Sequence, residues 1–301
     1  WRLNLNEQAP DELRAAQSLL KADSTSGCLM TVYYWSQMFG SATSRSDLIL
    51  DFSVDRLVFD TTSAASLGVS YSSAYNYLSL SAPDSTGITK TLVLNGFDFR
   101  KLYMVNGSSS SAPGLYFTDG SKLLVGDGTV GTTADDGANV LTGGSGNDKF
   151  YGLGGADTMV GGDGKDTFYA LGSDSIDGGA GGDWVSFTNV TSVSVDFNKH
   201  IATTSDGSTI LLTSIESTSG TSGADMFVGG DPAHAWLQNG SLTVESFYGL
   251  GGNDTIIGAA GSEFTTQANY NGSTQWAIAD LHAGFAIDSY GGLDTLVNVS
   301  N

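Results

Sequence analysis

The chain has 301 residues and a mass of 31.2 kDa, enough for one large domain or two ordinary domains with a substantial core. It carries 12 basic and 32 acidic residues, and a surface with this net charge of −20 repels nucleic acid and anionic lipid, so we expect neither as a partner. The 40% of hydrophobic residues exclude a disordered acidic tail, and no apolar run approaches the roughly 20 residues of a transmembrane segment.

The acidic residues and the glycines are concentrated in the second part of the chain. Residues 1–133 have 9 basic and 12 acidic side chains, a net charge of −3. Residues 134–301 have 3 basic and 20 acidic side chains, a net charge of −17, and 30 of the 41 glycines. This change of composition predicts two domains, 1–133 and 134–301, with the boundary near Thr133.

The N-terminal domain is predicted to be β-rich with one short helix. Pro10 suits a first helical position, and Asp11 and Glu12 suit the positive end of the helix dipole. The apolar face of this helix consists of Leu13, Ala16, Leu19 and Leu20. Segments with high β propensity, separated by turn residues, follow at 48–52, 56–59, 67–71, 75–80, 91–94, 97–105, 115–117 and 122–125. Many short strands at this spacing predict a compact all-β unit, either a sandwich or a meander.

From residue 134 onward the sequence repeats every nine residues. The central copies read GGSGNDKFY (143–151), GLGGADTMV (152–160) and GGDGKDTFY (161–169). Position 6 of successive copies is Asn139, Asp148, Asp157, Asp166 and Asp183, with Asp174 taking this place in a shortened copy (170–177), and the apolar residue two places later is Leu141, Phe150, Met159, Phe168, Ile176 and Val185. The pattern fills a block at 134–186 and returns at 220–297, after a spacer at 187–219 that we expect to hold strands at 193–197 and 210–215. The second block contains an insertion at 229–248.

This pattern resembles the nonapeptide G-G-x-G-x-D-x-U-x of the repeats-in-toxin (RTX) family, in which U is apolar. The resemblance implies an all-β parallel β-roll loaded with several calcium ions. Each glycine-rich loop turns the chain and each short strand points its apolar residue inward, so two repeats make one coil. Loops two repeats apart then lie together, which pairs Asp148 with Asp166, Asp157 with Asp174, and Asp166 with Asp183. Carboxylates and loop carbonyls supply the oxygen ligands that calcium prefers.

The candidate metal ligands follow from the repeat positions. In the first block they are Asp135, Gly137, Asn139, Gly144, Gly146, Asp148, Gly152, Gly154, Asp157, Gly161, Gly162, Asp163, Gly164, Asp166, Asp174, Gly178, Ala180 and Asp183. In the second block they are Asp225, Asp254 and Asp294, whose partner loops look interrupted or missing in the sequence. Glu263 is interpreted as a turn acid. Asp51, Asp55 and Asp60 lie in a segment resembling the flanks of RTX blocks and are either turn acids, which we favour, or part of a calcium site.

The motifs of catalysis are absent from the sequence, so we expect no enzyme. There is no H-E-x-x-H helix and no G-x-S-x-G, the signatures of the protease and lipase domains that some RTX proteins carry. His200, His234 and His282 share no metal-like spacing. The Asp231-Pro232 bond resembles the self-cleavage point of some RTX relatives, but the rest of that module is not recognisable.

These observations predict a calcium-binding extracellular structural protein of the bacterial cell surface, of S-layer or adhesin type, secreted by a type I route and folded by calcium after export. The alternatives are the non-catalytic RTX portion of a secreted polysaccharide epimerase, lyase or protease, and a carbohydrate-binding module that uses the aromatic residues. The expected partners besides calcium are other copies of the chain or a cell-surface polysaccharide. The chain starts at Trp1 without a basic-then-apolar signal, so we expect a mature product, a fragment, or a protein exported without a cleaved signal.

Overall fold

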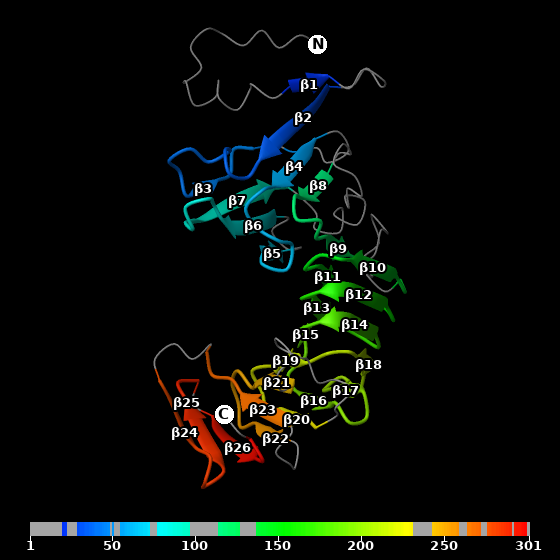
Figure 1. The fold of residues 1–301 in the computed structure, drawn as a ribbon, viewed down its shortest axis with the longest axis vertical. Helices are drawn as coiled ribbons and strands as arrows, with labels where there is room; N and C mark the ends of the chain where they lie inside the picture. The colour runs from blue at the N-terminus through cyan, green and yellow to red at the C-terminus, as the bar shows by residue number, and fades with distance from the viewer. Residues whose placement is uncertain are drawn as a thin grey trace. The chain divides into compact units, whose positions relative to one another are not determined.

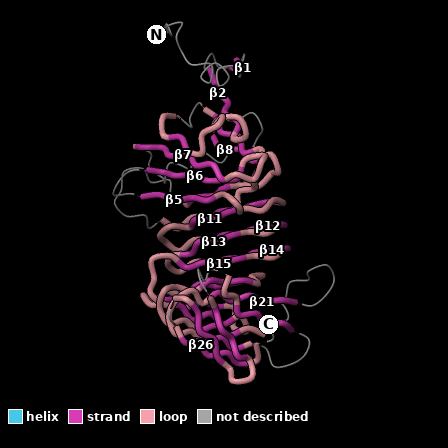
Figure 2. Tube along the Cα trace, turned by 90° about the vertical axis from the view of Figure 1, so that its left-hand side faces the viewer, coloured by secondary structure: helices cyan, strands magenta, loops and turns pink. Residues whose placement is uncertain are grey.

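The computed structural model describes residues 20–22, 29–48, 50, 55–72, 77–96, 114–126, 137–230, 243–258, 264–271, 276–290 and 292–299. These residues form strands and turns with no helix, which confirms the all-β fold (Figures 1 and 2). Accordingly, they include no helix of the length and apolar character that crossing a membrane requires. The predicted N-terminal helix lies outside the described residues, except that Leu20 begins a strand. The chain divides into two compact units, residues 1–123 and 124–301.

The first unit contains two sheets of four strands each. One has the order β1-β2-β4-β8, with bounds Leu20–Ala22, Leu29–Tyr34, Arg56–Phe59 and Gly114–Phe117. The other has the order β3-β7-β6-β5, with bounds Ser44–Arg45, Thr89–Asn95, Tyr77–Pro83 and Gly68–Ser72. The strands β5, β6 and β7 form an antiparallel meander, whereas β2, β4 and β8 pair in parallel. Aromatic rings fill the core, where the Phe59 ring lies 4.9 Å from that of Trp35 and 4.7 Å from that of Phe117.

Five strands of this unit, β4 to β8, were located from the sequence, and the first three were missed. The predicted segments at 56–59, 67–71, 75–80, 91–94 and 115–117 overlap β4 to β8. The strands β1, β2 and β3 were not predicted, and the predicted strand at 97–105 lies outside the described residues.

The second unit is a β-roll built from two sheets. The described strands of the first, called the short sheet, are β9 (Leu123–Val125), β11 (Lys149–Tyr151), β13 (Thr167–Ala170), β15 (Trp184–Phe187), β19 (Ser217–Ser219), β21 (Thr243–Tyr248) and β23 (Phe264–Ala268). Those of the second, called the long sheet, are, in spatial order, β10 (Val140–Gly144), β12 (Thr158–Gly164), β14 (Ser175–Gly181), β18 (Thr209–Thr213), β17 (Ile201–Thr204), β16 (Val193–Asp196), β20 (Met226–Val228), β22 (Thr255–Ile257), β26 (Leu293–Val297), β25 (Phe285–Asp288) and β24 (Ala277–Asp280).

Successive repeats enter the two sheets alternately, so repeats two apart are neighbours. In the short sheet Phe150 lies opposite Phe168, and Phe168 lies opposite Val185. In the long sheet Leu141, Met159 and Ile176 align in the same way. All six side chains are buried in one core cluster, as position 8 of the repeat predicts. The strands β12 and β14 are longer than predicted, because they continue through position 4 of the following loop.

The spacer is built differently from the repeats. The strands β16, β17 and β18 form an antiparallel meander inserted between β14 and β20 of the long sheet. The turn between β17 and β18 contains Asp206 and Gly207, where the Asp206 carboxylate accepts hydrogen bonds from Ser208 and Thr204. The spacer adds three strands to the long sheet but only β19 to the short sheet. Sequence patterning located β16 and β18 and missed β17 and β19.

The glycines of the loops allow two backbones to approach closely. Gly162 has φ = +112°, and a Cβ atom there would collide with the carbonyl oxygen of Gly144 in the loop one coil earlier. Gly207 also has a positive φ of +89°, but no atom lies within 4 Å of the place its Cβ would take. The two glycines therefore separate the cost of backbone strain from the cost of a clash.

We expect Gly162→Ala to destabilise the calcium-loaded protein much more than Gly207→Ala. The Gly207 variant bears only the strain of a left-handed residue, about 1–2 kcal/mol, whereas the Gly162 variant adds an overpacking cost of about 1–3 kcal/mol. Urea unfolding in excess calcium, followed by circular dichroism, measures both. Equal losses of stability would contradict the close stacking of the loops.

Candidate calcium sites

A column of buried carboxylates follows the loops that precede the short sheet. Asp148, Asp166 and Asp183 end these loops, and each is at most 1% exposed. The Asp148 N–H donates to Oδ1 of Asp166 at 2.7 Å, and the Asp166 N–H donates to Oδ1 of Asp183 at 2.8 Å. Asp166 and Asp183 thus each hold the backbone of the coil before them. We call this set the short-sheet column.

A second column follows the loops that precede the long sheet. The Asn139 N–H donates to Oδ1 of Asp157 at 2.8 Å, and the Asp157 N–H donates to Oδ1 of Asp174 at 3.0 Å. We call Asn139, Asp157 and Asp174 the long-sheet column. The two columns confirm the predicted pairing of loops two repeats apart.

The second block continues the same geometry, which corrects the expectation that its partner loops are interrupted or missing. The Asp225 N–H donates to Oδ1 of Asp254, and the Asp254 N–H donates to Oδ1 of Asp294, both at 2.9 Å. These pairs are 29 and 40 residues apart, and the parallel register of β20, β22 and β26 brings them together. Between these acids the chain contributes β21 and β23 to the short sheet, and the strands of the long sheet keep the same parallel register.

The second carboxylate oxygens point to a bound cation. Oδ2 of Asp166 and Oδ2 of Asp183 are buried and accept no hydrogen bond in the described structure. An ionised carboxylate in such a place carries a large desolvation penalty unless a cation compensates it. A Cβ on Gly161 would collide with Oδ2 of Asp166 and with the carbonyl oxygen of Gly178, so glycine keeps both oxygens close together. The residues present therefore fit a hard cation.

Backbone oxygens must supply most of the ligands at such sites. Within the described ranges, no three side chains of His, Cys, Asp or Glu gather at one point. Calcium takes six to eight oxygen ligands and accepts carbonyls readily, whereas zinc prefers nitrogen and sulfur. The donor set of paired carboxylates and glycine carbonyls is therefore of the calcium type.

Burial raises the pKa of the column carboxylates well above the ordinary range of aspartate. The pKa of Asp166, Asp183 and Asp254 rises to about 7, and that of Asp174 to about 6. Desolvation is the largest cause in each case, and the hydrogen bonds from the preceding coil act in the opposite direction. Near neutral pH, ionisation of these groups therefore favours either unfolding or the binding of a cation.

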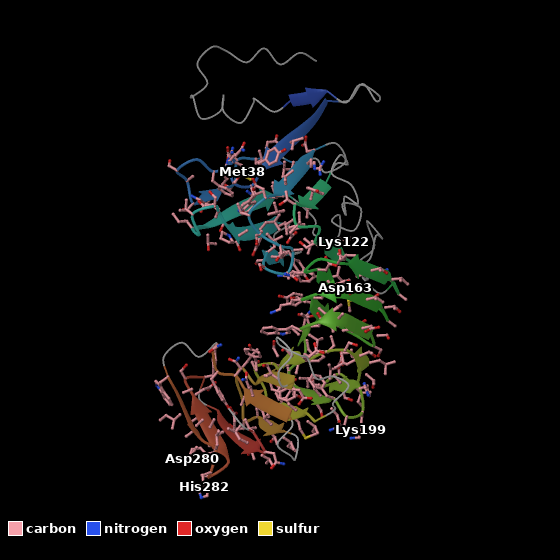
Figure 3. The ribbon with its side chains drawn as sticks, viewed as in Figure 1. Met38, Lys122, Asp163, Lys199, Asp280 and His282 are labelled. Atoms are coloured by element: carbon pink, nitrogen blue, oxygen red, sulfur yellow. The ribbon has the colours of Figure 1, made fainter. Side chains whose placement is uncertain are left out.

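The remaining predicted ligands fall into three groups. The carbonyl oxygens of Gly137, Gly144, Gly146, Gly152, Gly161, Gly162, Gly164 and Gly178 lie against glycines of a neighbouring segment, whereas Gly154 lies in the loop between β11 and β12. Asp163 and Ala180 are opposite each other in the register of β12 and β14, and Asp163 is exposed on the edge of the roll (Figure 3). Asp135, Glu263 and Asp51 lie outside the described residues.

The other residues singled out in the sequence form no metal site in the described structure. The Asp60 carboxylate, directly after β4, accepts hydrogen bonds from the N–H and the hydroxyl of Ser36, so it ties two distant segments together rather than capping its own turn. His282 lies at the tip of the turn between β24 and β25 (Figure 3), and His200 lies between β16 and β17 in the spacer. His234 and the Asp231-Pro232 bond are outside the described residues.

One acid of the short-sheet column, Glu216, was not predicted from the sequence. Glu216 lies in the spacer, is buried, and accepts the Asp183 N–H on Oε2 at 2.9 Å. No glycine-rich loop precedes it, so the nonapeptide pattern contains no sign of its role. The only available signal was its place directly before a short β-prone segment.

We expect Asp166→Ala to weaken calcium binding more than Asp294→Ala. Asp166 lies between Asp148 and Asp183 and belongs to two successive pairs, whereas Asp294 ends the column of the second block and belongs to one. A tenfold loss of affinity at two saturated sites lowers stability by about 2.8 kcal/mol. Calorimetric calcium titrations of both variants and of a control, Asp206→Ala, compare the midpoints. A larger shift for Asp294→Ala than for Asp166→Ala would contradict the column geometry.

The raised pKa values also predict an opposite pH dependence for the calcium-free and calcium-loaded protein. Between about pH 4 and pH 7 the folded state binds more protons than the unfolded state, so the stability of the calcium-free roll falls as the pH rises. Calcium requires the ionised carboxylates, so its apparent affinity falls as the pH is lowered through 7. Circular dichroism in calcium-free buffer and calcium titrations, each at pH 5.5 and pH 8, measure the two trends. Calcium-free stability that rises with pH would be inconsistent with buried column acids.

The comparison with known protein families agrees with this geometry. The RTX calcium-binding nonapeptide repeat matches the chain in four copies, over residues 133–168, 170–187 and 240–264. No curated protein matches the chain. The matched residues include every acid of the short-sheet column from Asp148 to Asp183 and also Asp254 of the second block. Residues 133–168, 170–187 and 240–264 therefore contain RTX calcium-binding nonapeptide repeats, which occur in both blocks of the C-terminal region.

Proposed function

We propose that this chain is a secreted bacterial protein whose roll folds on calcium outside the cell and then serves as a structural element of the cell surface, of S-layer or adhesin type. The observation that supports it best is the buried carboxylates of the two columns. In the short-sheet column, Asp166 and Asp183 each keep one oxygen without a hydrogen-bond donor in the described structure. A roll of this kind is stable only when cations occupy it.

The charge of the region couples its folding to the extracellular medium. Residues 134–301 have 20 acidic side chains and only 3 lysines, so the net charge of −17 opposes compaction when calcium is scarce. Extracellular calcium modules bind at about 10⁻⁴–10⁻³ M, far above the free calcium of a cytosol. The chain therefore stays loose during export and folds after it.

An exposed edge of the long sheet supports self-association of the folded chain. The strand β24 ends the described long sheet, and every residue of it is exposed. Its Ile278 is 59% exposed, with Trp276 and Leu281 exposed beside it. An edge strand that presents apolar side chains pairs readily with another chain. This edge fits a second copy of the chain better than it fits a sugar, because the last strand of the described sheet offers one side of its backbone for strand pairing.

Circular dichroism with and without calcium tests the folding step. In chelator we expect the β signal of residues 134–301 to be largely lost and to return on adding millimolar calcium, since metal binding supplies the folding free energy. Limited proteolysis in chelator should cut the roll first, because residues 1–133 carry a net charge of only −3 and have a core of their own. A spectrum that calcium leaves unchanged would refute the proposal.

Electron microscopy of the calcium-loaded chain tests assembly. We expect ordered assemblies from the unmodified chain and none from Ile278→Lys, while both keep the calcium-induced β signal. Leu211→Lys is a matched control, because Leu211 is also exposed on the long sheet but lies inside it, on β18. Assembly of Ile278→Lys would place the contact elsewhere, and a monomeric calcium-loaded chain would favour the alternative of a secretion module from a larger enzyme.

A further inference from the structure

Glu216 extends the short-sheet column into a segment that has no nonapeptide. The spacer strand β19 pairs in parallel with β15, so that Ser217 lies opposite Trp184. This register places Glu216 opposite Asp183, and its Oε2 accepts the Asp183 N–H at 2.9 Å. The same bond links Asp166 to Asp183 one coil earlier, at 2.8 Å. Glu216 thus occupies the place of the next repeat aspartate.

A carbonyl oxygen of the spacer completes the resemblance to a repeat loop. In the repeats, a Cβ on Gly161 would collide with Oδ2 of Asp166 and with the carbonyl oxygen of Gly178. At the spacer, a Cβ on Gly178 would lie 2.5 Å from Oδ2 of Asp183 and would collide with the carbonyl oxygen of Ser214. Ser214 therefore presents its carbonyl where the next loop would present a glycine carbonyl.

The identity of the acid follows from the length of this turn. In a repeat loop the aspartate follows the first glycine by five positions, whereas Glu216 follows Ser214 by only two. Ser214 adopts the left-handed conformation, with φ = +52°, which allows so short a turn. A glutamate has one more methylene group than an aspartate, and the longer side chain reaches the column from the shorter turn.

Asp183 provides an independent sign that this place suits a ligand. Its side chain is fully buried, and its Oδ2 accepts no hydrogen bond in the described structure. That oxygen lies beside the Ser214 carbonyl rather than beside a donor. Burial raises the pKa of Glu216 to about 8, so two acids share a desolvated site with one unsatisfied oxygen.

We propose that Asp183, Glu216 and the carbonyl of Ser214 form a further calcium site, outside the nonapeptides, that joins the first repeat block to the spacer. The inference rests on the proposed function, because it requires a roll that binds calcium. Its role is to continue the column beyond Asp183, where the repeats stop. The coil containing β19 is then held to the coil containing β15 by an ion as well as by strand pairing.

A cavity beside Glu216 gives an ion access to this site. It also suggests a second candidate for the counter-charge of Glu216. A cavity of about 320 Å³ is lined by Glu216 together with Lys165, Gly182, Ser217, Ser246 and Tyr248, among others. An ion can reach Glu216 through this space. Lys165 also lines it, so a lysine rather than a calcium ion is the alternative counter-charge for Glu216. The two possibilities predict different behaviour of a Lys165 variant.

Ion counting on the full chain tests the site. Equilibrium dialysis with calcium should show one ion fewer in Glu216→Gln than in the unmodified chain, and the full number in Asp206→Asn, which changes an exposed spacer acid. Lys165→Met should keep the full number. An unchanged count in Glu216→Gln, or the same loss in Lys165→Met, would overturn the proposal. If the unmodified chain binds no calcium at all, the proposed function has failed, which is a different result.

Terbium luminescence gives a second measurement if Glu216→Gln folds poorly. Trp184 directly follows Asp183, so it should sensitise an ion bound there more strongly than ions in distant coils. Glu216→Asp keeps the charge but shortens the side chain. We expect the terbium affinity, read from the Trp184-sensitised signal, to fall about tenfold while the β signal stays intact. Trp184→Phe identifies which part of the signal comes from this site. A Trp184-dependent signal with unchanged affinity in Glu216→Asp would overturn the assignment.

Discussion

The structure of the roll depends on a carboxylate that is buried with only one of its two oxygens satisfied by the protein. In Asp166 and in Asp183, Oδ1 accepts a hydrogen bond from a backbone N–H of the preceding coil, and nothing in the described structure donates to Oδ2. The polypeptide alone therefore leaves a desolvated charge at these two carboxylates, and a divalent cation removes that penalty. The glycines serve the same end, because they bring loop carbonyls close enough to act as the other ligands.

The first repeat block could be predicted from sequence because its signals are local and periodic. The apolar residue at position 8 and the acid at position 6 recur often enough to fix the alternation of sheets, and the structure buries Phe150, Met159 and Phe168 accordingly. The second block was harder to predict. Asp225, Asp254 and Asp294 are separated by long segments, and only the parallel register of their strands shows that they stack. Strand pairing across 29 or 40 residues leaves no trace in a local pattern.

Glu216 shows why a motif alone underestimates the columns. The structural requirement is an acid whose oxygen reaches the N–H of the previous coil, and the nonapeptide is one way of meeting it. The spacer meets it with a short left-handed turn at Ser214 and a longer side chain. A search for glycine-rich loops cannot find such a residue, whereas the hydrogen bond to Asp183 identifies it at once.

The unequal number of strands in the spacer has a consequence for the path of the roll. Between β14 and β20 the long sheet has three strands, whereas between β15 and β21 the short sheet has only β19. Neighbouring strands are about 4.8 Å apart, so one side of the stack gains roughly 10 Å that the other side lacks. The spacer is therefore a wedge, and the axis of the roll turns toward the short sheet where the wedge is inserted. The number of strands placed in a spacer thus sets the curvature of an otherwise straight rod, independently of how many ions the rod binds.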